Sequence, residues 1–342
     1  MNRKMSRREA LRWMAMAATA SLVACQNRNI NRSTTTESPT QADTRLPDPT
    51  VTEQPVSPTP GATGTTQPVD PTPDQAYLSV ARGEDTAAIT ETALRALGGI
   101  ERFVKNGYDV IIKPNICADN YPYEYGATTN PIVVATLVRL ALGAGARQVR
   151  VMDFPFGGTS ESAYAKSGIA DAVHAAGGQM EVMNPNKYRL AGIPEGESLT
   201  QCMIYQDVLN CDLLIDVPTA KDHRLARVTA GCKNLLGIIR DRGAIHANMA
   251  QRIPDLVSLV RPGLTVIDAV RTLMAHGPTG GNLDDVKINN TVIASHDVVA
   301  ADSYATGLFN LTGADIPYIV NAAERGLGRM NLSGLKIEEA SL

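Results

Sequence analysis

The sequence predicts an α/β domain in which a mostly parallel sheet is flanked by helices. From about Ala76 to Leu342, short apolar runs alternate with longer segments of helical period, and strands that alternate with helices pair in parallel. The composition, 44% hydrophobic and 20% charged, is typical of a globular protein. Because the domain is long for a single sheet, two lobes around one crevice is an alternative architecture.

In the first half of the domain, the residues that begin helices and the apolar periods are easy to identify. A helix over 131–142 is expected to be capped by Asn130 and to start at Pro131, since Asn is a good N-cap and Pro fits the first helical position. Apolar residues recurring every three or four positions predict two more helices, over 86–105 and 160–176. The predicted strands are YLSVAR, DVIIKPN, QVRVMD and MEVMN.

The second half follows a stretch that has no clear pattern. Three apolar runs predict strands, and three segments of helical period predict helices. The strands are DLLIDVP, LTVIDAV and NTVIASHD, and the helices cover 228–240, 249–260 and 298–309. We expect residues 76–342 to form one α/β region built from these elements.

Residues 1–25 have the pattern of an export signal. A cationic segment containing Arg7 and Arg8 precedes an uncharged run from Trp13 to Ala24, which is shorter than the roughly 20 apolar residues of a membrane-spanning helix. The segment S-R-R-E-A-L-R is close to the twin-arginine export pattern. Ala10 replaces the usual Phe, so Sec export is an alternative.

The end of this segment, Leu22-Val23-Ala24-Cys25, is typical of a bacterial lipobox. We expect Cys25 to be lipidated and to anchor the mature chain, outside the cytoplasm, to a bacterial membrane, and the sequence leaves open which membrane carries the anchor. The alternative is an uncleaved anchor with an unmodified cysteine. Residues 26–75 are rich in Thr, Pro and Ser and predict a disordered tether.

Charge and cysteine content exclude some kinds of partner. The net charge is −3 and no Lys/Arg block follows the N-terminus, so we expect no nucleic acid partner. The later cysteines, Cys117, Cys202, Cys211 and Cys232, contain no C-x-x-C pair. Spacing therefore favours neither a zinc ribbon nor an iron–sulfur cluster.

Polar side chains follow five of the predicted strands. In a parallel sheet, ligands bind beyond the carboxyl ends of the strands, where several loops converge. For Asp153 and Asp297, helix capping is an equally good explanation. The polar residues at the five strand ends include Lys113, Asn115, Asp153, Asp216, Lys221, His223, Asp268, Ser295 and Asp297.

A second concentration of polar residues lies between Lys221 and His246. Thr229 and Lys233 are four apart and would share a face of the predicted helix, and Asn234 follows. Such groups suit a carboxylate or phosphate. We expect Lys221, His223 and Lys233 to lie nearest the reacting atoms, as acid–base groups.

A divalent metal is a competing interpretation of the site. Asp268 and Asp302 are the candidate ligands, with His223, His246 and Asp297 as further donors. No H-x-x-H or H-E-x-x-H spacing supports a metal, so the cofactor stays open.

Several stretches resemble the family known as domain of unknown function 362. They are KPNIC, ATTNPIVVATLVRLALGAGA, VPTAKDHRLARVTAGCKNLLG, HGPTGG, ASHDVVAADSYATGL and AAERGLGRMNLSGL. The resemblance implies a shared cleft without an established reaction, and it adds Thr128 and Thr129 to the expected ligand-binding residues. Many relatives carry a ferredoxin-like cysteine cluster, which this chain lacks, so no iron–sulfur role is expected.

Two functions from different classes fit these patterns. The first is an enzyme acting on a small anionic metabolite by acid–base or metal-assisted chemistry. The alternative is a solute-capturing lipoprotein in which the same site closes on a ligand without catalysis. An adaptor without a ligand is a third interpretation.

Overall fold

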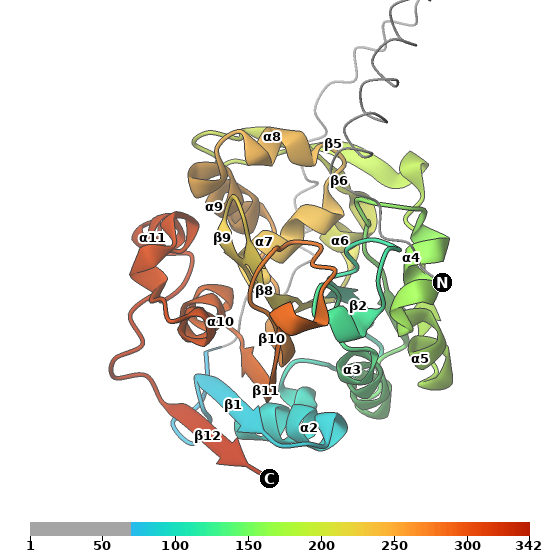
Figure 1. Cartoon of the computed structure of the whole chain (residues 1–342), viewed down its shortest axis with the longest axis vertical. Coiled ribbons are helices and arrows are strands. Elements are labelled where there is room, and N and C mark those ends of the chain that lie inside the picture. Colours follow the sequence, from blue (N-terminus) through green and yellow to red (C-terminus); the bar gives the residue numbers. More distant parts are fainter. Residues whose placement is uncertain (1–69) are drawn as a thin grey trace, which may run out of the picture. The chain divides into compact units, whose positions relative to one another are not determined.

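A mixed, mostly parallel sheet of ten strands runs through the part of the chain that the structure, a computed structural model, describes, residues 70–342 (Figure 1). Its main path is β12-β1-β11-β10-β7-β2-β3-β4, and β8 and β9 branch from β10. The predicted fold class is confirmed. The strands are β1 (Leu78–Arg82), β2 (Asp109–Pro114), β3 (Gln148–Val151), β4 (Gln179–Met180), β7 (Leu213–Val217), β8 (Thr219–His223), β9 (Arg227–Thr229), β10 (Leu264–Leu273), β11 (Val286–Ser295) and β12 (Ile337–Ser341).

The described residues belong to one compact unit, so they form one body rather than the two lobes considered above. No helix within residues 70–342 combines the length and the apolar character that crossing a membrane requires. The predicted export signal, Cys25 and residues 26–69 of the predicted tether lie outside the described residues.

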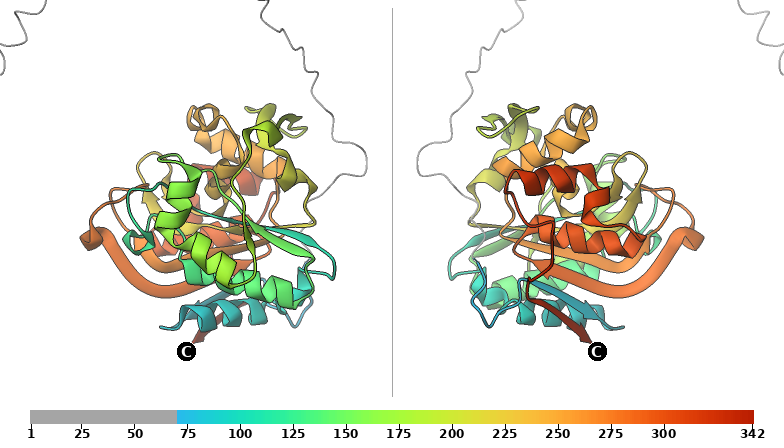
Figure 2. Two further views of the ribbon diagram at one scale, coloured as in Figure 1. Left: turned by 90° about the vertical axis from the view of Figure 1, so that its right-hand side faces the viewer. Right: turned by 90° about the vertical axis from the view of Figure 1, so that its left-hand side faces the viewer.

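Helices cover both faces of the sheet (Figures 1 and 2). One face packs against α2, α3, α4 and α5, and the other against α7, α9, α10 and α11. Two short helices, α6 and α8, complete the set among these residues. The helices are α2 (Thr86–Ala96), α3 (Pro131–Gly143), α4 (Ser160–Ser167), α5 (Ile169–Ala175), α6 (Gln206–Asn210), α7 (Gly231–Asn234), α8 (Arg242–His246), α9 (Met249–Leu259), α10 (Val298–Ala305) and α11 (Pro317–Glu324).

The strands alternate their side chains between two apolar cores. In β2, Val110 and Ile112 face the core under α2 and α3, whereas Ile111 faces the core under α9 and α10. Successive side chains of a strand point to opposite faces of the sheet. A strand buried on both faces needs apolar residues at every position, which explains the unbroken apolar runs in the sequence.

Local chemistry sets most helix boundaries. Asn130 caps α3 by accepting a hydrogen bond from the Ile132 N–H, with Pro131 at the first position, as predicted. The helix expected over 86–105 ends at Ala96, because Gly98 and Gly99 adopt positive φ angles of 99° and 81°. The helix expected over 160–176 is interrupted at Gly168, which has a φ of 75°.

Two segments differ from the prediction more strongly. The helix expected over 228–240 is instead strand β9, the four-residue helix α7 and a 3₁₀ turn. Every residue of 228–239 is buried, so its apolar pattern carries no period that separates a helix from other structure. The unpatterned stretch contains a two-stranded antiparallel sheet of β5 (Tyr188–Gly192) and β6 (Gln201–Tyr205).

Strands β10 and β11 form a long antiparallel hairpin, visible as the curved orange ribbon in Figure 2. Ser295, the last residue of β11, pairs with Thr265 near the start of β10. Because β10 runs parallel to β7, the carboxyl end of β11 lies at the opposite edge of the sheet from the carboxyl ends of β2, β3 and β7. Only a three-residue 3₁₀ turn, Leu283–Asp285, lies between the two strands, so there is no α-helical crossover of the kind that joins parallel strands.

An ion-pair cluster joins strand β3 to its neighbours. The Arg150 guanidinium bonds the Asp109 carboxylate at 2.8 Å, the Glu181 carboxylate at 3.1 Å and the Asp207 carboxylate. Burial alone would raise the pKa of Glu181, but hydrogen bonds from Tyr205, Lys187 and Arg150 lower it. The ionised carboxylate therefore stabilises the fold above its ordinary pKa of 4.5, and this contribution is lost as the pH falls below that value.

Changing Arg150 to Met should lower the free energy of unfolding by about 2–4 kcal/mol, because it removes the cation that three partly buried carboxylates share. Lys187 still pairs with Glu181 and Asp207, but Asp109 loses its cation. Urea unfolding at pH 7 measures the effect. Arg139 serves as the control, since its ion pair with Glu91 is solvent-exposed and its loss should cost less than about 1 kcal/mol. Equal effects of the two changes would contradict this account.

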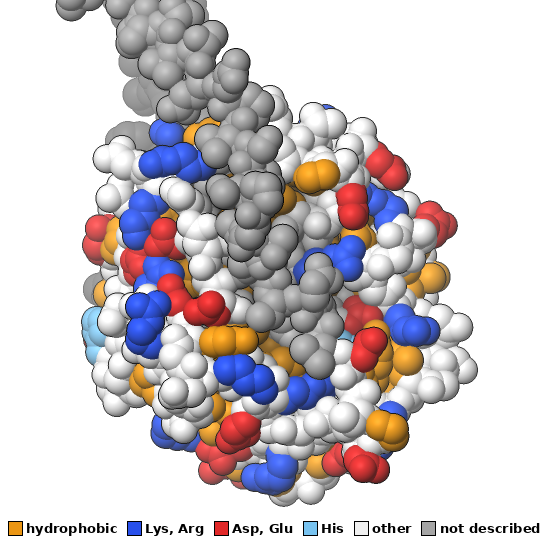
Figure 3. Space-filling model, turned by 180° about the vertical axis from the view of Figure 1, so that it is seen from behind, with side chains coloured by type: hydrophobic (Ala, Val, Ile, Leu, Met, Phe, Trp, Pro, Cys, Tyr) orange, Lys and Arg blue, Asp and Glu red, His pale blue; other side chains and the backbone are white. Residues whose placement is uncertain are grey.

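Cationic and acidic side chains are interspersed on the described surface seen in Figure 3. On that face they form no extended patch of one sign. Positive charge is concentrated instead inside a cavity, which is described below.

Candidate functional site

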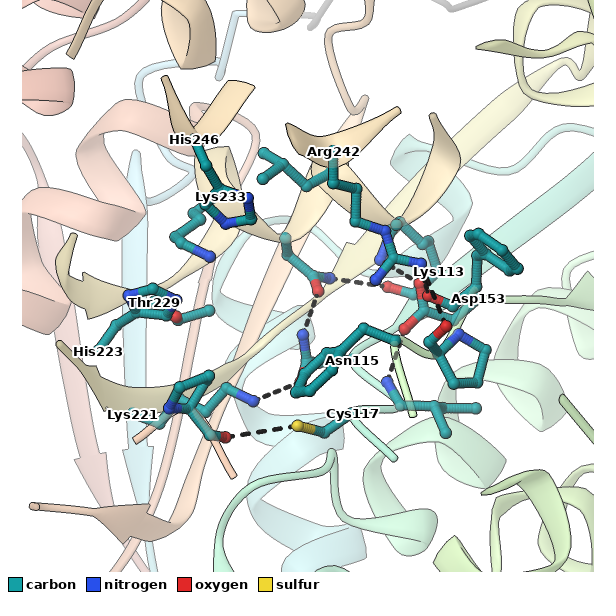
Figure 4. Close-up of a pocket in the computed structure, with 18 of the residues that line it drawn as sticks. Lys113, Asn115, Cys117, Asp153, Lys221, His223, Thr229, Lys233, Arg242 and His246 are labelled. Carbon is teal, nitrogen blue, oxygen red and sulfur yellow. Dashed lines mark hydrogen bonds and ion pairs between the residues drawn. The ribbon is translucent and has the colours of Figure 1, made fainter. Parts of the chain in front are cut away.

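A cavity of about 550 Å³ lies where β2 and β3 end and where β8 and β9 meet α7 and α8 (Figure 4). Its wall is assembled from segments far apart in the sequence, because loops converge at the carboxyl ends of parallel strands. The lining residues are Lys113, Asn115, Ile116, Cys117, Asp153, Phe154, Pro155, Phe156, Lys221, His223, Arg224, Leu225, Thr229, Lys233, Asn234, Leu236, Gly237, Arg240, Arg242, His246 and Pro278.

Most of the predicted site residues line this one cavity. In Figure 4, Lys221, His223, Thr229, Lys233 and His246 lie on one side and Lys113, Asp153 and Arg242 on the other. Thr229 does not share a helix with Lys233. It ends β9, where it pairs across the ladder with Lys221. The predicted residues found in the lining are Lys113, Asn115, Asp153, Lys221, His223, Thr229, Lys233, Asn234 and His246.

Thr128 and Thr129 lie behind the lining. The Thr129 hydroxyl accepts a hydrogen bond from the Asn115 N–H at 2.8 Å and donates one to the Val217 carbonyl at 2.8 Å. The Thr128 hydroxyl accepts one from the Cys117 N–H at 3.3 Å. Both residues therefore hold the loop that follows β2 and do not line the cavity.

Ser295 and Asp297 lie at the other edge of the sheet. Ser295 donates a hydrogen bond to the Tyr77 carbonyl at 2.8 Å, and Asp297 caps α10 by accepting from the N–H groups of Val299 and Ala300. The antiparallel direction of β11 carries them there. Asp297 borders a separate cavity of about 360 Å³ and not the one described above.

Asp268 and Asp302 also lie outside the lining, and each is committed to backbone groups. Asp268, in the middle of β10, accepts hydrogen bonds from the N–H groups of Asn130 and Val270. Asp302 accepts them from Gly231 and Cys232 at the start of α7. No group of three or more His, Cys, Asp or Glu side chains within residues 70–342 is placed to hold a metal ion.

The cavity carries a large excess of positive charge. Of the described residues that line it, Asp153 supplies the sole carboxylate. Opposite charges attract strongly in a poorly hydrated site, so an anionic guest is favoured. The cations are Lys113, Lys221, Arg224, Lys233, Arg240 and Arg242.

The one carboxylate is already paired. Lys113 donates to Asp153 at 2.8 Å, and the two side chains are 1% and 3% exposed. The Ile116 N–H bonds the other Asp153 oxygen at 2.6 Å. Gly237 packs over this pair, and a methyl group added there would lie 1.9 Å from the Asp153 carboxylate. Asp153 is therefore neutralised by Lys113, which leaves the remaining cations for a ligand.

A chain of hydrogen bonds crosses the floor of the cavity. Lys221 donates to the Asn115 amide oxygen at 2.8 Å, and the Asn115 NH₂ donates to the Asn234 amide oxygen at 2.8 Å. Asn234 in turn donates to Asp216 at 2.8 Å. Complete burial raises the pKa of Asp216 well above its ordinary value. The chain fixes the orientation of both amides, so the donors and acceptors of the floor are preorganised.

Lys233 differs from Lys113 and Lys221, whose ammonium groups donate to Asp153 and Asn115, because its own ammonium group makes no hydrogen bond to a described residue. It is 8% exposed, and no described residue accepts a hydrogen bond from its ammonium group. Burial and the neighbouring Lys221 charge lower the pKa of Lys233 to about 7. The buried Thr229 hydroxyl also lacks a partner among the described residues. Two open polar groups are therefore available to a ligand.

The backbone fixes the protonation of His223. The N–H groups of Leu225 and Ala226 both donate to His223 Nδ1 at 3.1 Å, so that nitrogen carries no proton and Nε2 is the protonated one. Burial, followed by the charges of Lys233 and Lys221, lowers the pKa of His223 to about 3. His223 is thus a neutral hydrogen-bond donor at Nε2, whereas the sequence predicted a general acid or base near neutral pH.

We expect His223 to remain neutral, with its proton on Nε2, from pH 5 to pH 9. Two-bond ¹⁵N–¹H correlation spectra report the tautomer directly. His276 is the internal control, because its hydrogen bond with Asp285 raises its pKa above 6.5, so it should titrate within the same spectra. A doubly protonated His223 at pH 5.5 would contradict the assignment.

His246 and Arg242 come from α8 and border the cavity. The His246 ring is stacked parallel to the His223 ring, with 6.5 Å between centroids. Arg242 lies over the Phe154 ring at 4.7 Å and donates to the Phe154 carbonyl. These contacts tie α8 to the loop after β3 and hold both sides of the site together.

Sequence reasoning missed part of the lining. Arg224, Arg240 and Arg242 lie inside the polar stretch 221–246, and their charge was the available signal. Cys117, whose thiol donates to the Pro278 carbonyl at 3.4 Å, gave none beyond its place after a strand. The apolar members, such as Phe156 and Leu225, have no sequence signal that separates them from core residues.

The cavity lies in a part of the chain that is shared with a known protein family. The model of the family described as domain of unknown function (DUF362) matches residues 110–307, which include every cavity-lining residue. A thylakoid-associated protein of Synechocystis sp. is 26% identical over 250 residues, covering 70% of this chain and 74% of that relative.

Solved structures show distant likenesses. The lactate racemase apoprotein from Thermoanaerobacterium thermosaccharolyticum has a TM-score of 0.42 at 15% identity, covering 70% of this chain. A protein from Thermotoga maritima has a TM-score of 0.43 at 13% identity, covering 67% of this chain. The chain spans 58% and 60% of their respective lengths. Both scores are too low to support an argument about function.

Proposed function

This chain belongs to the DUF362 family, and we propose that its cavity binds a small organic anion and transfers a proton to or from it. The observation that carries the proposal is the charge of the lining. Three lysines and three arginines face a cavity whose single carboxylate is paired with Lys113.

Anion binding follows from the unpaired cations. A lysine ammonium or an arginine guanidinium makes short, charge-assisted hydrogen bonds to a carboxylate or phosphate. Lys221 sits on the hydrogen-bonded floor, and Lys233 and Thr229 offer groups without protein partners. A ligand with negative charge therefore gains several hydrogen-bond donors in the cavity.

The proposal of proton transfer rests on the different protonation of Lys233 and His223. With its pKa lowered to about 7, Lys233 exchanges a proton near neutral pH, as a general acid or base must. His223 offers a fixed N–H donor that stabilises negative charge as it develops on the ligand. In this proposal Lys233 transfers the proton, and His223 only donates a hydrogen bond.

A solute-capturing protein needs the same cations but has no use for a lysine tuned to neutral pH. The pKa of Lys233 is therefore what favours an enzyme over capture. Capture remains the outcome to be distinguished by experiment.

The test is a thermal-shift screen followed by exchange in D₂O. Small carboxylates and phosphates should raise the melting temperature, whereas their neutral amides and isosteric cations should not. Anions that bind are then incubated with the protein in D₂O, and deuterium incorporation is measured by mass spectrometry. Binding without incorporation would support capture, and equal binding of neutral isosteres would overturn anion recognition.

We also propose that the domain works outside the cytoplasm on a lipid anchor. The support is the sequence of residues 1–25, with its cationic segment, short apolar run and lipobox ending at Cys25. Mass spectrometry of the mature protein should find a diacylglyceryl group on Cys25. A Cys25→Ser chain should leave the membrane fraction, and one that stays there would contradict the anchor.

A further inference from the structure

The cavity has an apolar part that the anion-binding argument does not use. Among the described lining residues, this part comes mainly from the loop after β3 and from the turn between β8 and β9. The loop after β2, the 3₁₀ turn after α7 and the loop at Pro278 complete it. Its members are Ile116, Phe154, Pro155, Phe156, Leu225, Leu236 and Pro278.

Two of these side chains are unusually open to solvent. Phe156 is 55% exposed and Leu225 is 57% exposed, although both are large and apolar. Phe154, in the same loop as Phe156, is held beneath Arg242 and against Tyr188. Exposed apolar groups beside a cavity mark a surface that a ligand covers.

The turn that carries Leu225 is rigid. The Leu225 N–H bonds His223 Nδ1 at 3.1 Å, so the same turn fixes the His223 tautomer and places Leu225 at the cavity. The loop of Phe156 is fixed in a similar way, because the Phe156 N–H bonds the Cys117 carbonyl at 3.1 Å. Both side chains are therefore presented by backbone that is hydrogen-bonded to other residues lining the cavity, His223 and Cys117.

The volume of the cavity exceeds what a very small anion fills. A cavity of about 150 Å³ accommodates benzene, and this one is about 550 Å³. It falls within the roughly 300–1,000 Å³ typical of pockets for larger organic ligands. A two- or three-carbon acid would leave the apolar part in contact with water.

We propose that the natural ligand is an amphipathic organic anion, whose charged group binds at Lys221, beside Lys233, and whose apolar body covers Phe156 and Leu225. This assignment rests on the proposed anion site and adds the substrate class. Phe156 and Leu225 are then specificity-determining residues, since they touch the ligand away from its charged group.

The experiment measures dissociation constants for straight-chain carboxylates of two to eight carbons by NMR titration at pH 6.5. Each methylene buried against the protein should tighten binding by about fourfold, from roughly 0.8 kcal/mol per CH₂. Changing Phe156 or Leu225 to Ser should reduce this dependence on chain length while the affinity for acetate changes by less than about twofold.

Leu283→Ser is the matched control. Leu283 is 52% exposed and does not line the cavity, so its loss should alter neither the acetate affinity nor the chain-length dependence. All three side chains are largely exposed, so the variants should keep the parent melting temperature, which is checked first.

The outcomes separate the two proposals. Equal affinity for acetate and octanoate in the parent protein would overturn the amphipathic ligand while leaving the anion site standing. A chain-length dependence that survives both Phe156→Ser and Leu225→Ser would overturn the assignment of those residues. Failure of every carboxylate in the series to bind would overturn the anion site and the inference together.

Discussion

Changing Lys233 to Met should lower turnover of the anion found by D₂O exchange by about 10²–10⁴-fold, the usual contribution of a general acid or base. Lys233 is buried, has no hydrogen-bond partner among the described residues and has a pKa of about 7. Its neutral amine is the proton acceptor that the cavity offers. The measurement is the initial rate of deuterium incorporation at saturating anion.

Lys233→Arg separates charge from proton transfer. Arginine keeps a positive charge at this position but does not release its proton below about pH 12. We expect Lys233→Arg to retain most of the anion affinity and to lose turnover as completely as Lys233→Met. Lys166→Met, which removes an exposed lysine of α4, is the control and should leave both quantities unchanged.

The pH dependence of kcat/KM tests directly whether Lys233 is the group that accepts the proton. Only neutral Lys233 accepts a proton, so kcat/KM should rise with pH through about 7 and then level off. The positive charge of Lys221 is one of the causes that lower the pKa of Lys233. Lys221→Met should therefore move the rise in kcat/KM to higher pH. A profile whose midpoint is the same in both proteins would show that Lys233 is not the titrating group.

The part of the site that sequence predicts best is the rim at and just beyond the ends of β2, β3 and β7. Lys113, Asp153 and Lys221 each lie at or just beyond an apolar run. Parallel strands bring such positions to one edge of a sheet regardless of the details of packing. The direction of the strands alone therefore predicts that Lys113 and Lys221, which are far apart in the chain, lie in one site.

The same rule fails where strand direction reverses. The run ending in Ser295 and Asp297 looks like any other strand end, because an apolar run contains no mark of its direction in the sheet. The sign of reversal is the lack of an α-helix between the two strands, here β10 and β11, which only a short 3₁₀ turn separates. Treating that gap as a hairpin would have placed Asp297 at the far edge.

The state of each side chain was beyond the reach of sequence. His223 was expected to exchange protons, but two backbone N–H groups fix its tautomer, and burial together with nearby lysines keeps it neutral. Asp302 was a candidate metal ligand, but it holds the start of α7. Such roles depend on which backbone N–H groups lie within about 3 Å of the side chain. The spacing of residues in the sequence does not specify these contacts.

Changing Asp153 to Ala should lower the free energy of unfolding by about 3–5 kcal/mol, the usual result of removing one partner of a buried ion pair. Lys113 and Asp153 are almost completely buried and lie 2.8 Å apart. The variant leaves the Lys113 ammonium without its counter-charge and the Ile116 N–H without its acceptor. Urea denaturation at pH 7, followed by circular dichroism, measures the loss.

Glu91→Ala is the control for this change, because it breaks the exposed pair with Arg139 and should cost less than about 1 kcal/mol. Gly237→Ala offers a second approach to the same pair, since the added methyl group meets the Asp153 carboxylate at 1.9 Å. It should destabilise the protein by about 1–3 kcal/mol, whereas Gly307→Ala, with open space around it, should not. If Asp153→Ala and Glu91→Ala cost the same, Asp153 does not neutralise Lys113, and the count of cations free for a ligand must be revised.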